Sequence, residues 1–221
     1  MGRYLVIGAS GGIGSALVAA LTERGVQVVP LSRSADGFDI TDEASVDAHL
    51  DALEGQFDGI IIATGALEVD GATPEKTVKA VSAQAMADQF ALNATGPALV
   101  LRHAARLLPR EGASVCAVLT ARVGSIGDNR IGGWTSYRAA KAAANQIVHT
   151  TAIELARTHP DLVCVAIHPG TVKTPFTAKY LARHPAVPAD EAADNILDVL
   201  QGLTPDQSGG FYDWAGKEVA W

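Results

Sequence analysis

Tyr137 and Lys141 stand four residues apart in a stretch, residues 136–158, that is rich in alanine and contains neither glycine nor proline. In a helix this spacing places both side chains on one face, about one turn apart. A phenol with its ordinary pKa of about 10 transfers protons poorly at neutral pH, but a neighbouring ammonium favours the ionised phenol and lowers that pKa. The pair therefore predicts acid-base chemistry on an oxygen, although the same spacing also arises by chance in surface helices.

Gly8, Gly12 and Gly14 lie in a loop directly between an apolar run and a helical pattern. Glycines at this place allow a tight turn and bring the backbone close to a ligand, while the N-terminus of the helix faces a pyrophosphate. The loop, including Ser10 and Ile13, is therefore predicted to bind a dinucleotide. A glycine-rich turn that holds no ligand is the simpler alternative.

The end of the second apolar run indicates which dinucleotide is bound. A carboxylate there binds the adenosine ribose and favours NAD, whereas an arginine accommodates the 2′-phosphate of NADP. Ser32 and Arg33 occupy this position, and the first acidic residue after them is Asp36. The sequence therefore favours NADP (NADPH) over NAD, with a solvent-facing Arg33 as the alternative.

The elements that must position these residues alternate along the whole chain. Short apolar runs predict strands, helical spacing predicts helices between them, and Thr41 and Ser82 are expected to cap two of these helices. Such alternation predicts a doubly wound α/β domain with a mostly parallel sheet. The expected strands cover residues 4–7, 26–31, 57–63, 115–119, 163–167 and 211–214, and the expected helices cover 13–24, 41–53, 82–108, 136–158 and 190–200.

The composition excludes several other classes of protein. The 221 residues carry 17 basic and 24 acidic side chains, a net charge of −7, and 48% are hydrophobic, which excludes an intrinsically disordered chain. The acidic balance argues against nonspecific nucleic-acid binding, and no apolar run approaches the roughly 20 residues that cross a bilayer. The two cysteines and six histidines show no metal-ligand spacing. We expect a cytoplasmic protein without a metal.

Taken in order, the motifs resemble those of the short-chain dehydrogenase/reductase family over essentially the whole length of the chain. Residues 124–134 look like the branch of C-factor signalling proteins and sniffer-type carbonyl reductases. The matching features are Gly8 to Gly14, Asp39-Ile40, Thr64-Gly65, Asn93, Tyr137 with Lys141, and Pro169-Gly170 with Thr174.

The resemblance implies a single Rossmann-type domain over residues 1–221, with a seven-stranded, mostly parallel sheet and helices on both faces. It also implies an NADP-dependent oxidoreductase that moves hydride between the cofactor and a small carbonyl compound or secondary alcohol. A homodimer or homotetramer is expected. A nucleotide-binding regulatory or signalling protein of the same fold, with little turnover, is the alternative.

The resemblance further implies a role for each matching residue. Tyr137 exchanges a proton with the substrate oxygen, Lys141 lowers the tyrosine pKa and holds the nicotinamide ribose, and Asn93 anchors a water of the proton relay. The remaining cofactor contacts come from Asp39 and the Ile40 backbone at the adenine, Thr174 at the carboxamide, and Thr64, Gly65, Pro169, Gly170 and Val172.

One departure from the family pattern affects the chemistry. The usual catalytic serine aligns with Ala121, and its hydroxyl could instead come from Thr120 at the strand end, from Ser125 in the following loop, or from neither. We favour Ser125 slightly, and loss of such a donor costs about 10²-fold in rate. Candidates for the substrate pocket are Arg130, Trp134, Phe176 and Tyr180.

Overall fold

Six short apolar segments form one parallel sheet in the computed structural model, which describes residues 2–69, 71–174, 177 and 186–221. The strand order is β2-β1-β3-β4-β5-β6, and all five neighbouring pairs are parallel. Parallel neighbours require crossover connections, which the helices supply. The strands are β1 (Arg3–Ile7), β2 (Gln27–Leu31), β3 (Gly59–Ile62), β4 (Ser114–Leu119), β5 (Leu162–His168) and β6 (Phe211–Asp213).

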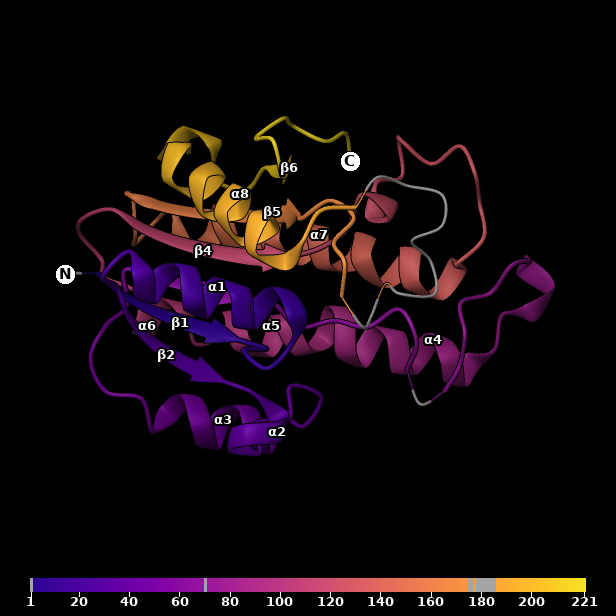
Figure 1. Cartoon of the computed structure of the whole chain (residues 1–221), viewed down its shortest axis with the longest axis horizontal. Helices are drawn as coiled ribbons and strands as arrows, with labels where there is room; N and C mark the ends of the chain where they lie inside the picture. The colour runs from indigo at the N-terminus through magenta and orange to yellow at the C-terminus, as the bar shows by residue number, and fades with distance from the viewer. Residues whose placement is uncertain (1, 70, 175–176, 178–185) are drawn as a thin grey trace.

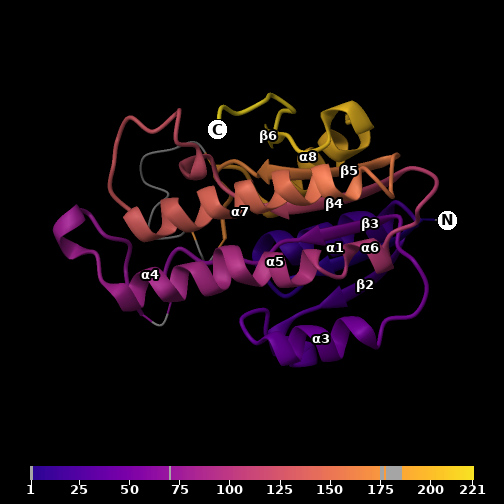
Figure 2. The same cartoon turned by 180° about the vertical axis from the view of Figure 1, so that it is seen from behind.

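Helices cover both faces of the sheet. Figure 1 shows α1 and α8 in front of the strands, and Figure 2 shows α5 and α7 on the opposite face. Side chains that alternate along the strands enter two separate cores, one on each face, as a doubly wound sheet requires. The helices are α1 (Gly12–Glu23), α2 (Arg33–Asp36), α3 (Glu43–Asp51), α4 (Ala83–Phe90), α5 (Gly96–Leu101), α6 (Ala104–Leu107), α7 (Thr135–Leu155) and α8 (Ala189–Gly202), with a π-helical turn over Ala91–Thr95.

The sheet confirms the predicted fold class, but the expected count of seven strands is wrong for the part of the chain described. After β2 the chain enters α2, and the next backbone amides bond locally: Phe38 N donates to the Ser32 carbonyl oxygen and Asp39 N to the Ser45 hydroxyl. These bonds hold residues 37–40 as a turn against α3. The segment therefore does not extend the sheet beyond its edge strand β2.

The predicted helix starts are partly confirmed. Ser82 caps α4, because its hydroxyl accepts a hydrogen bond from Ala85 N at 3.1 Å. At α3 the expected cap was Thr41, but the Asp42 carboxylate caps the helix by accepting from Ala44 N at 3.1 Å. A carboxylate at this place also complements the helix dipole.

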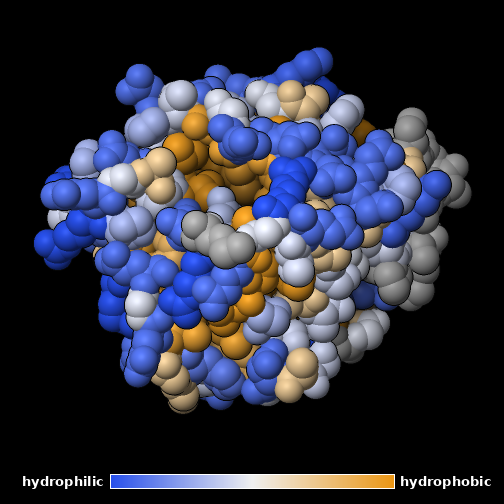
Figure 3. All heavy atoms as spheres, turned by 60° about the vertical axis from the view of Figure 1, so that its left-hand side comes forward, coloured by the Kyte–Doolittle hydropathy of each residue, from blue (hydrophilic) through white to orange (hydrophobic). Residues whose placement is uncertain are grey.

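The two ends of the sheet differ. The amino ends of the strands come forward in Figure 3, where apolar side chains gather in a hollow between hydrophilic surfaces. At the carboxyl ends, Thr120 directly follows β4, and Tyr137 and Lys141 lie on α7. The other two predicted catalytic residues, Asn93 and Ser125, lie neither directly at a strand end nor on α7. Within the described ranges, no helix is long and apolar enough to span a bilayer, and no cluster of acidic, histidine and cysteine side chains could hold a metal.

Candidate active site

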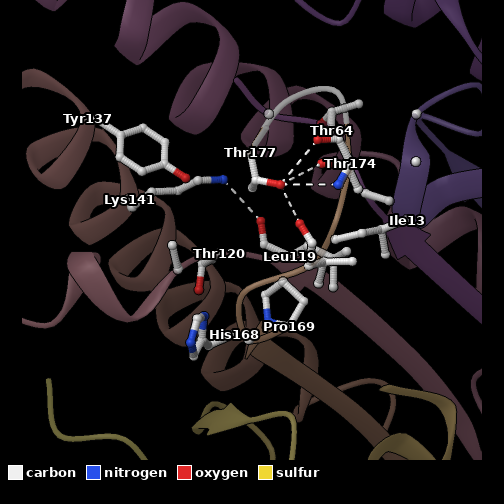
Figure 4. A pocket seen from close by; sticks show the side chains of 17 residues that line it. Ile13, Thr64, Leu119, Thr120, Tyr137, Lys141, His168, Pro169, Thr174 and Thr177 are labelled. Atoms are coloured by element: carbon white, nitrogen blue, oxygen red, sulfur yellow. Dashed lines mark hydrogen bonds between the residues drawn. The ribbon is translucent and has the colours of Figure 1, made fainter. Parts of the chain in front are cut away.

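A cavity of about 190 Å³ opens at the carboxyl ends of the strands, where doubly wound folds bind ligands. We call it the strand-end cavity, and Figure 4 shows its lining. The structure brings eleven of the predicted site residues into this lining: Gly12, Ile13, Thr64, Gly65, Thr120, Tyr137, Lys141, Pro169, Gly170, Val172 and Thr174.

The glycine loop has no room for side chains. Gly8 has a φ of +85°, and a Cβ on it would lie 2.9 Å from the Ala63 carbonyl carbon. A Cβ on Gly12 would lie 2.5 Å from Thr174 Cγ2, and one on Gly14 would collide with the Gly8 carbonyl oxygen. At these glycines the loop therefore packs closely on itself, on the Ala63 backbone and on the Thr174 side chain, with the N-terminus of α1 behind it. This geometry fits the pyrophosphate of a dinucleotide.

The Tyr137 and Lys141 side chains point into the same cavity from α7 (Figure 4). Lys141 is 4% exposed, and its Nζ lies 5.9 Å from the centre of the Tyr137 ring and donates to the Leu119 carbonyl oxygen at 3.1 Å. Burial lowers the pKa of Lys141 to about 8. Burial also raises the pKa of Tyr137 above its ordinary value. In the protein alone the phenol is therefore neutral, contrary to the expectation of a lowered pKa.

The N-terminus of α7 is capped from a distant loop. Trp134 at the cap position has a φ of 53° and makes no side-chain capping bond. Instead the Glu75 carboxylate, 7% exposed, accepts hydrogen bonds from Ser136 N at 3.3 Å and from the Ser136 hydroxyl. Burial raises the pKa of Glu75, but the bonds from Ser136 outweigh it and hold that pKa below its ordinary value. A buried carboxylate thus fixes the turn that carries Tyr137.

Asn93 lies in the π-helical turn and is fully buried. Its side-chain amide closes the loop after β3: Nδ2 donates to the Ala66 carbonyl oxygen at 3.0 Å and to Gln89 Oε1 at 2.7 Å, and Oδ1 accepts from Ala66 N. A Cβ on Gly65 would lie 2.8 Å from Asn93 Oδ1 and 3.0 Å from Lys141 Nζ. Asn93 therefore lies beside Lys141 without lining the cavity.

A second cavity of about 350 Å³ adjoins the first, and Tyr137 and His168 line both. We call it the loop hollow, because residues 121–138 supply most of its lining. Arg130 and Trp134 line it as expected. The other two pocket candidates, Phe176 and Tyr180, lie outside the described residues.

The family described as enoyl-(acyl carrier protein) reductase matches residues 8–200 of this chain. The chain is a short-chain dehydrogenase/reductase. It is 30% identical to 1-hydroxy-2-glutathionyl-2-methyl-3-butene dehydrogenase of Rhodococcus sp. (strain AD45) over all of both chains. It is 38% identical to C-signal of Myxococcus xanthus over 62% of this chain and 78% of that protein.

Solved structures share the fold. The carbonyl reductase Sniffer of D. melanogaster superposes with a TM-score of 0.83, 20% identity and full coverage of both chains. A short-chain dehydrogenase/reductase of Burkholderia multivorans with bound NADP has a TM-score of 0.80 and 27% identity over 100% of this chain and 99% of that one. This short-chain dehydrogenase/reductase is therefore an oxidoreductase of the carbonyl and alcohol class.

The structure separates the two candidates for the missing hydroxyl of this oxidoreductase. Thr120 lines the strand-end cavity, and its buried Oγ1 has no hydrogen-bond partner among the described residues. Ser125 is 2% exposed but lines neither cavity: its hydroxyl donates to the Ala220 carbonyl oxygen and accepts from Asp128 N at 3.0 Å. The slight preference for Ser125 is therefore not supported, because its hydroxyl is used to anchor the C-terminal segment.

The residues predicted to bind the adenosine end of the cofactor lie beside an acid, Asp36. Ser32 caps α2, which folds Asp36 back so that its carboxylate accepts from Ser32 N at 2.8 Å and from the Ser32 hydroxyl at 3.2 Å. Arg33 is exposed beside it. Asp39 accepts from the Thr41 backbone and hydroxyl. None of these residues lines the strand-end cavity, and the same holds for Ser10, Gly8, Gly14 and Ile40.

Sequence reasoning missed His168 in this family member. It lies at the carboxyl end of β5, and Thr120 N donates to the neighbouring Ile167 carbonyl oxygen, so His168 and Thr120 lie on adjacent strand ends. Burial, and then the charge of Arg122, lower the pKa of His168 to about 4, so the imidazole is neutral. Its place directly before the Pro169-Gly170 turn was the available signal, since residues at the carboxyl ends of parallel strands surround the ligand.

Proposed function

We propose that this short-chain dehydrogenase/reductase is an NADP-dependent enzyme that reduces a small carbonyl compound, with Tyr137 as proton donor. The observation that carries the proposal is the convergence of Tyr137, Lys141 and the unpartnered Thr120 hydroxyl in one cavity below the glycine loop.

The chain's own residues perform three tasks in this mechanism. Gly8, Gly12 and Gly14 bind the pyrophosphate by backbone contact, and Thr174 and the Pro169-Gly170 turn hold the nicotinamide end. When bound, the cofactor supplies the hydride. The Thr120 hydroxyl donates a hydrogen bond to the substrate oxygen and so stabilises the negative charge that develops there.

The protonation states in the protein favour reduction. Because burial raises the pKa of Tyr137, the side chain is a neutral phenol that can give its proton to the substrate oxygen. Lys141, with a pKa of about 8, remains mostly charged at neutral pH and stabilises the phenolate once it forms. Asn93 is placed beside Lys141, in support of a water that returns a proton from solvent. Oxidation of an alcohol requires the phenolate first, so it needs higher pH.

NADP is proposed over NAD on two grounds. Arg33 is the exposed cation at the end of β2 and can bind a 2′-phosphate. The Burkholderia multivorans structure, at 27% identity, was determined with bound NADP. Asp36 beside Ser32 is the group that would favour NAD, and Asp39 with the Ile40 backbone would meet the adenine. Family resemblance adds a homodimer or homotetramer formed through the helices near Asn93 and Tyr137.

The test is a fluorescence titration with NADPH and NADH, followed by a screen of aldehydes and ketones at saturating cofactor. We expect tighter binding of NADPH and oxidation of NADPH that depends on the carbonyl compound. Tight NADPH binding without turnover of any substrate would favour the alternative, a regulatory nucleotide-binding protein. The similarity to C-signal is the observation that supports this alternative. The oligomeric state is measured by light scattering on the eluted protein.

A further inference from the structure

The loop hollow carries positive charge in a protein whose net charge is −7. Three guanidinium groups and one carboxylate line it. Arg122 Nε lies 2.6 Å from the Asp128 carboxylate, so these two charges compensate each other. Arg130 and Arg138 have no carboxylate within 4.0 Å among the described residues. Three guanidinium charges against one carboxylate therefore leave an excess of positive charge in the lining, although Arg130 also acts on Asp128 at longer range.

Arg130 and Arg138 differ in what holds them. Arg138 is half-buried and donates only to backbone carbonyl oxygens, to Gly133 at 3.0 Å and Val123 at 3.2 Å among others, so it fixes the loop while keeping its charge. Burial lowers the pKa of Arg138, as expected for a cation that lacks an anionic neighbour. Arg130 is exposed, and among the described residues its side chain makes one hydrogen bond, to the adjacent Asn129 carbonyl oxygen at 3.2 Å. The described part of the chain thus leaves most of its five N–H donors available to a ligand.

The rest of the lining of the loop hollow is largely apolar and includes Leu67, Val123, Ile131 and Trp134. Its volume of about 350 Å³ suits a small organic ligand. Tyr137 lies on the boundary with the strand-end cavity, so a ligand in the hollow can present its reacting oxygen there. None of the glycines of the loop at residues 8–14 lines the hollow, so the arginines are not needed for the cofactor's phosphates.

We infer that the loop hollow selects carbonyl or hydroxyl substrates that carry a carboxylate, which Arg130 binds through its guanidinium fork with support from the charge of Arg138. The inference rests on the proposed function, because it places the reacting oxygen at Tyr137. The apolar walls enclose the body of the substrate. An arginine and a carboxylate form two parallel hydrogen bonds, which fix the orientation of the substrate as well as adding affinity.

A matched pair of substrates tests the inference: para-formylbenzoate and its methyl ester, which differ in charge and little in the reactivity of the aldehyde. With saturating NADPH we expect kcat/KM to be about tenfold higher for the carboxylate, mostly through KM. Arg130→Ala should lower kcat/KM for the carboxylate about tenfold more than for the ester. Arg130→Lys keeps the charge but not the planar fork, so its kcat/KM for the carboxylate should lie between those of the wild type and Arg130→Ala. Added salt should reduce the preference.

The control variant is Arg110→Ala, which removes an exposed arginine at a site away from both cavities and should leave both substrates unaffected. Calorimetric titration of the NADPH-loaded protein with benzoate, and with methyl benzoate as its neutral match, gives a readout that needs no turnover. Binding of benzoate that Arg130→Ala weakens supports the inference even if no aldehyde is reduced. The inference is overturned if the acid and the ester show equal kcat/KM and equal binding, or if Arg130→Ala lowers these quantities equally for both. The proposed reduction of a carbonyl compound would still stand.

Discussion

The strand-end cavity and the loop hollow share Tyr137 but are built in different ways. Beside the first, the glycine loop packs tightly: Gly8 lies against Ala63 and Gly12 against Thr174, with no space for a Cβ on either glycine. The second is bounded by the side chains of one long loop, several of them exposed. Positions without space for a Cβ tolerate only glycine, whereas exposed loop side chains can be replaced by many residue types. We therefore expect the first to determine the cofactor and the second to determine the substrate.

Tyr137→Phe should give the largest difference between the effect on turnover and the effect on cofactor binding. It removes the phenolic oxygen and keeps the ring, so the packing of α7 is retained. We expect kcat to fall about 10³-fold, since no other group in either lining can supply the proton at the same place. The Kd for NADPH should stay within about twofold, because the glycine loop is untouched. Stopped-flow reduction and cofactor fluorescence measure the two quantities, and retained turnover would rule out Tyr137 as the donor.

Thr120→Ala removes from the strand-end cavity a hydroxyl that has no hydrogen-bond partner among the described residues. We expect kcat to fall about 10²-fold, as for loss of one donor to a developing oxyanion. Ser125→Ala is the matched control: it deletes a hydroxyl that binds the Ala220 carbonyl oxygen, so it should lower stability by about 1 kcal/mol while changing kcat little. Steady-state rates and thermal unfolding of both variants decide the question. The opposite pattern would return the catalytic role to Ser125.

Gly14→Ala tests whether the close backbone packing within the glycine loop is needed for cofactor binding. The added methyl would collide with the Gly8 carbonyl oxygen, and we expect NADPH binding to weaken by about 2 kcal/mol, roughly 30-fold in Kd. Gly202→Ala adds the same methyl group where no atom lies within 4 Å, and it should leave Kd unchanged. Fluorescence titration measures both. If Gly14→Ala binds NADPH normally, the glycines are not required for the cofactor.

We expect the buried Lys141 side chain to lower the free energy of unfolding. Burial lowers its pKa from 10.5 to about 8, so below pH 8 the folded protein holds a charge that is better solvated in the unfolded chain. Between these two values the folded state has released the proton and the unfolded state has not, so stability rises with pH. Lys141→Met should therefore stabilise the cofactor-free protein by about 2 kcal/mol at pH 7, since it removes the desolvation cost. Urea unfolding at several pH values tests both the rise of stability with pH and the stabilisation by Lys141→Met.

The part of the site that the sequence predicts well is the part where steric constraints act locally. The glycine spacing, the Tyr137-Lys141 spacing and the Pro169-Gly170 turn each express a requirement of the backbone within a few residues, and all of these segments meet at the strand-end cavity. The parallel sheet followed in the same way, from short apolar runs separated by helical patterns.

The rest depends on contacts between distant segments. Glu75 lies 61 residues before Ser136, so no local pattern shows that it caps α7. The choice between Thr120 and Ser125 depends on where the C-terminal segment passes, since the Ala220 carbonyl oxygen occupies the Ser125 hydroxyl. A motif fixes spacing along the chain, but it does not show which hydroxyl is already in use.

Glu75→Ala tests a contact that links the two cavities through the position of Tyr137. It leaves Ser136 N and its hydroxyl without their acceptor at the first turn of α7, and the turn should loosen. We expect kcat to fall about tenfold, because a small displacement of a reacting group is costly. Stability should fall by about 1 kcal/mol. Glu75→Gln retains an acceptor without the charge and should recover part of the rate.

The control for Glu75 is Asp42→Ala, which removes a carboxylate cap from α3, far along the chain from either cavity. Both variants should lose similar stability, but only Glu75→Ala should lose kcat and show faster amide exchange at Ser136 and Tyr137. Exchange is measured without substrate, so it reports on the cap even in a protein with no turnover. If both variants lose kcat equally, the rate follows global stability. Turnover of the substrate would then be no more sensitive to the position of α7 than binding of the cofactor is.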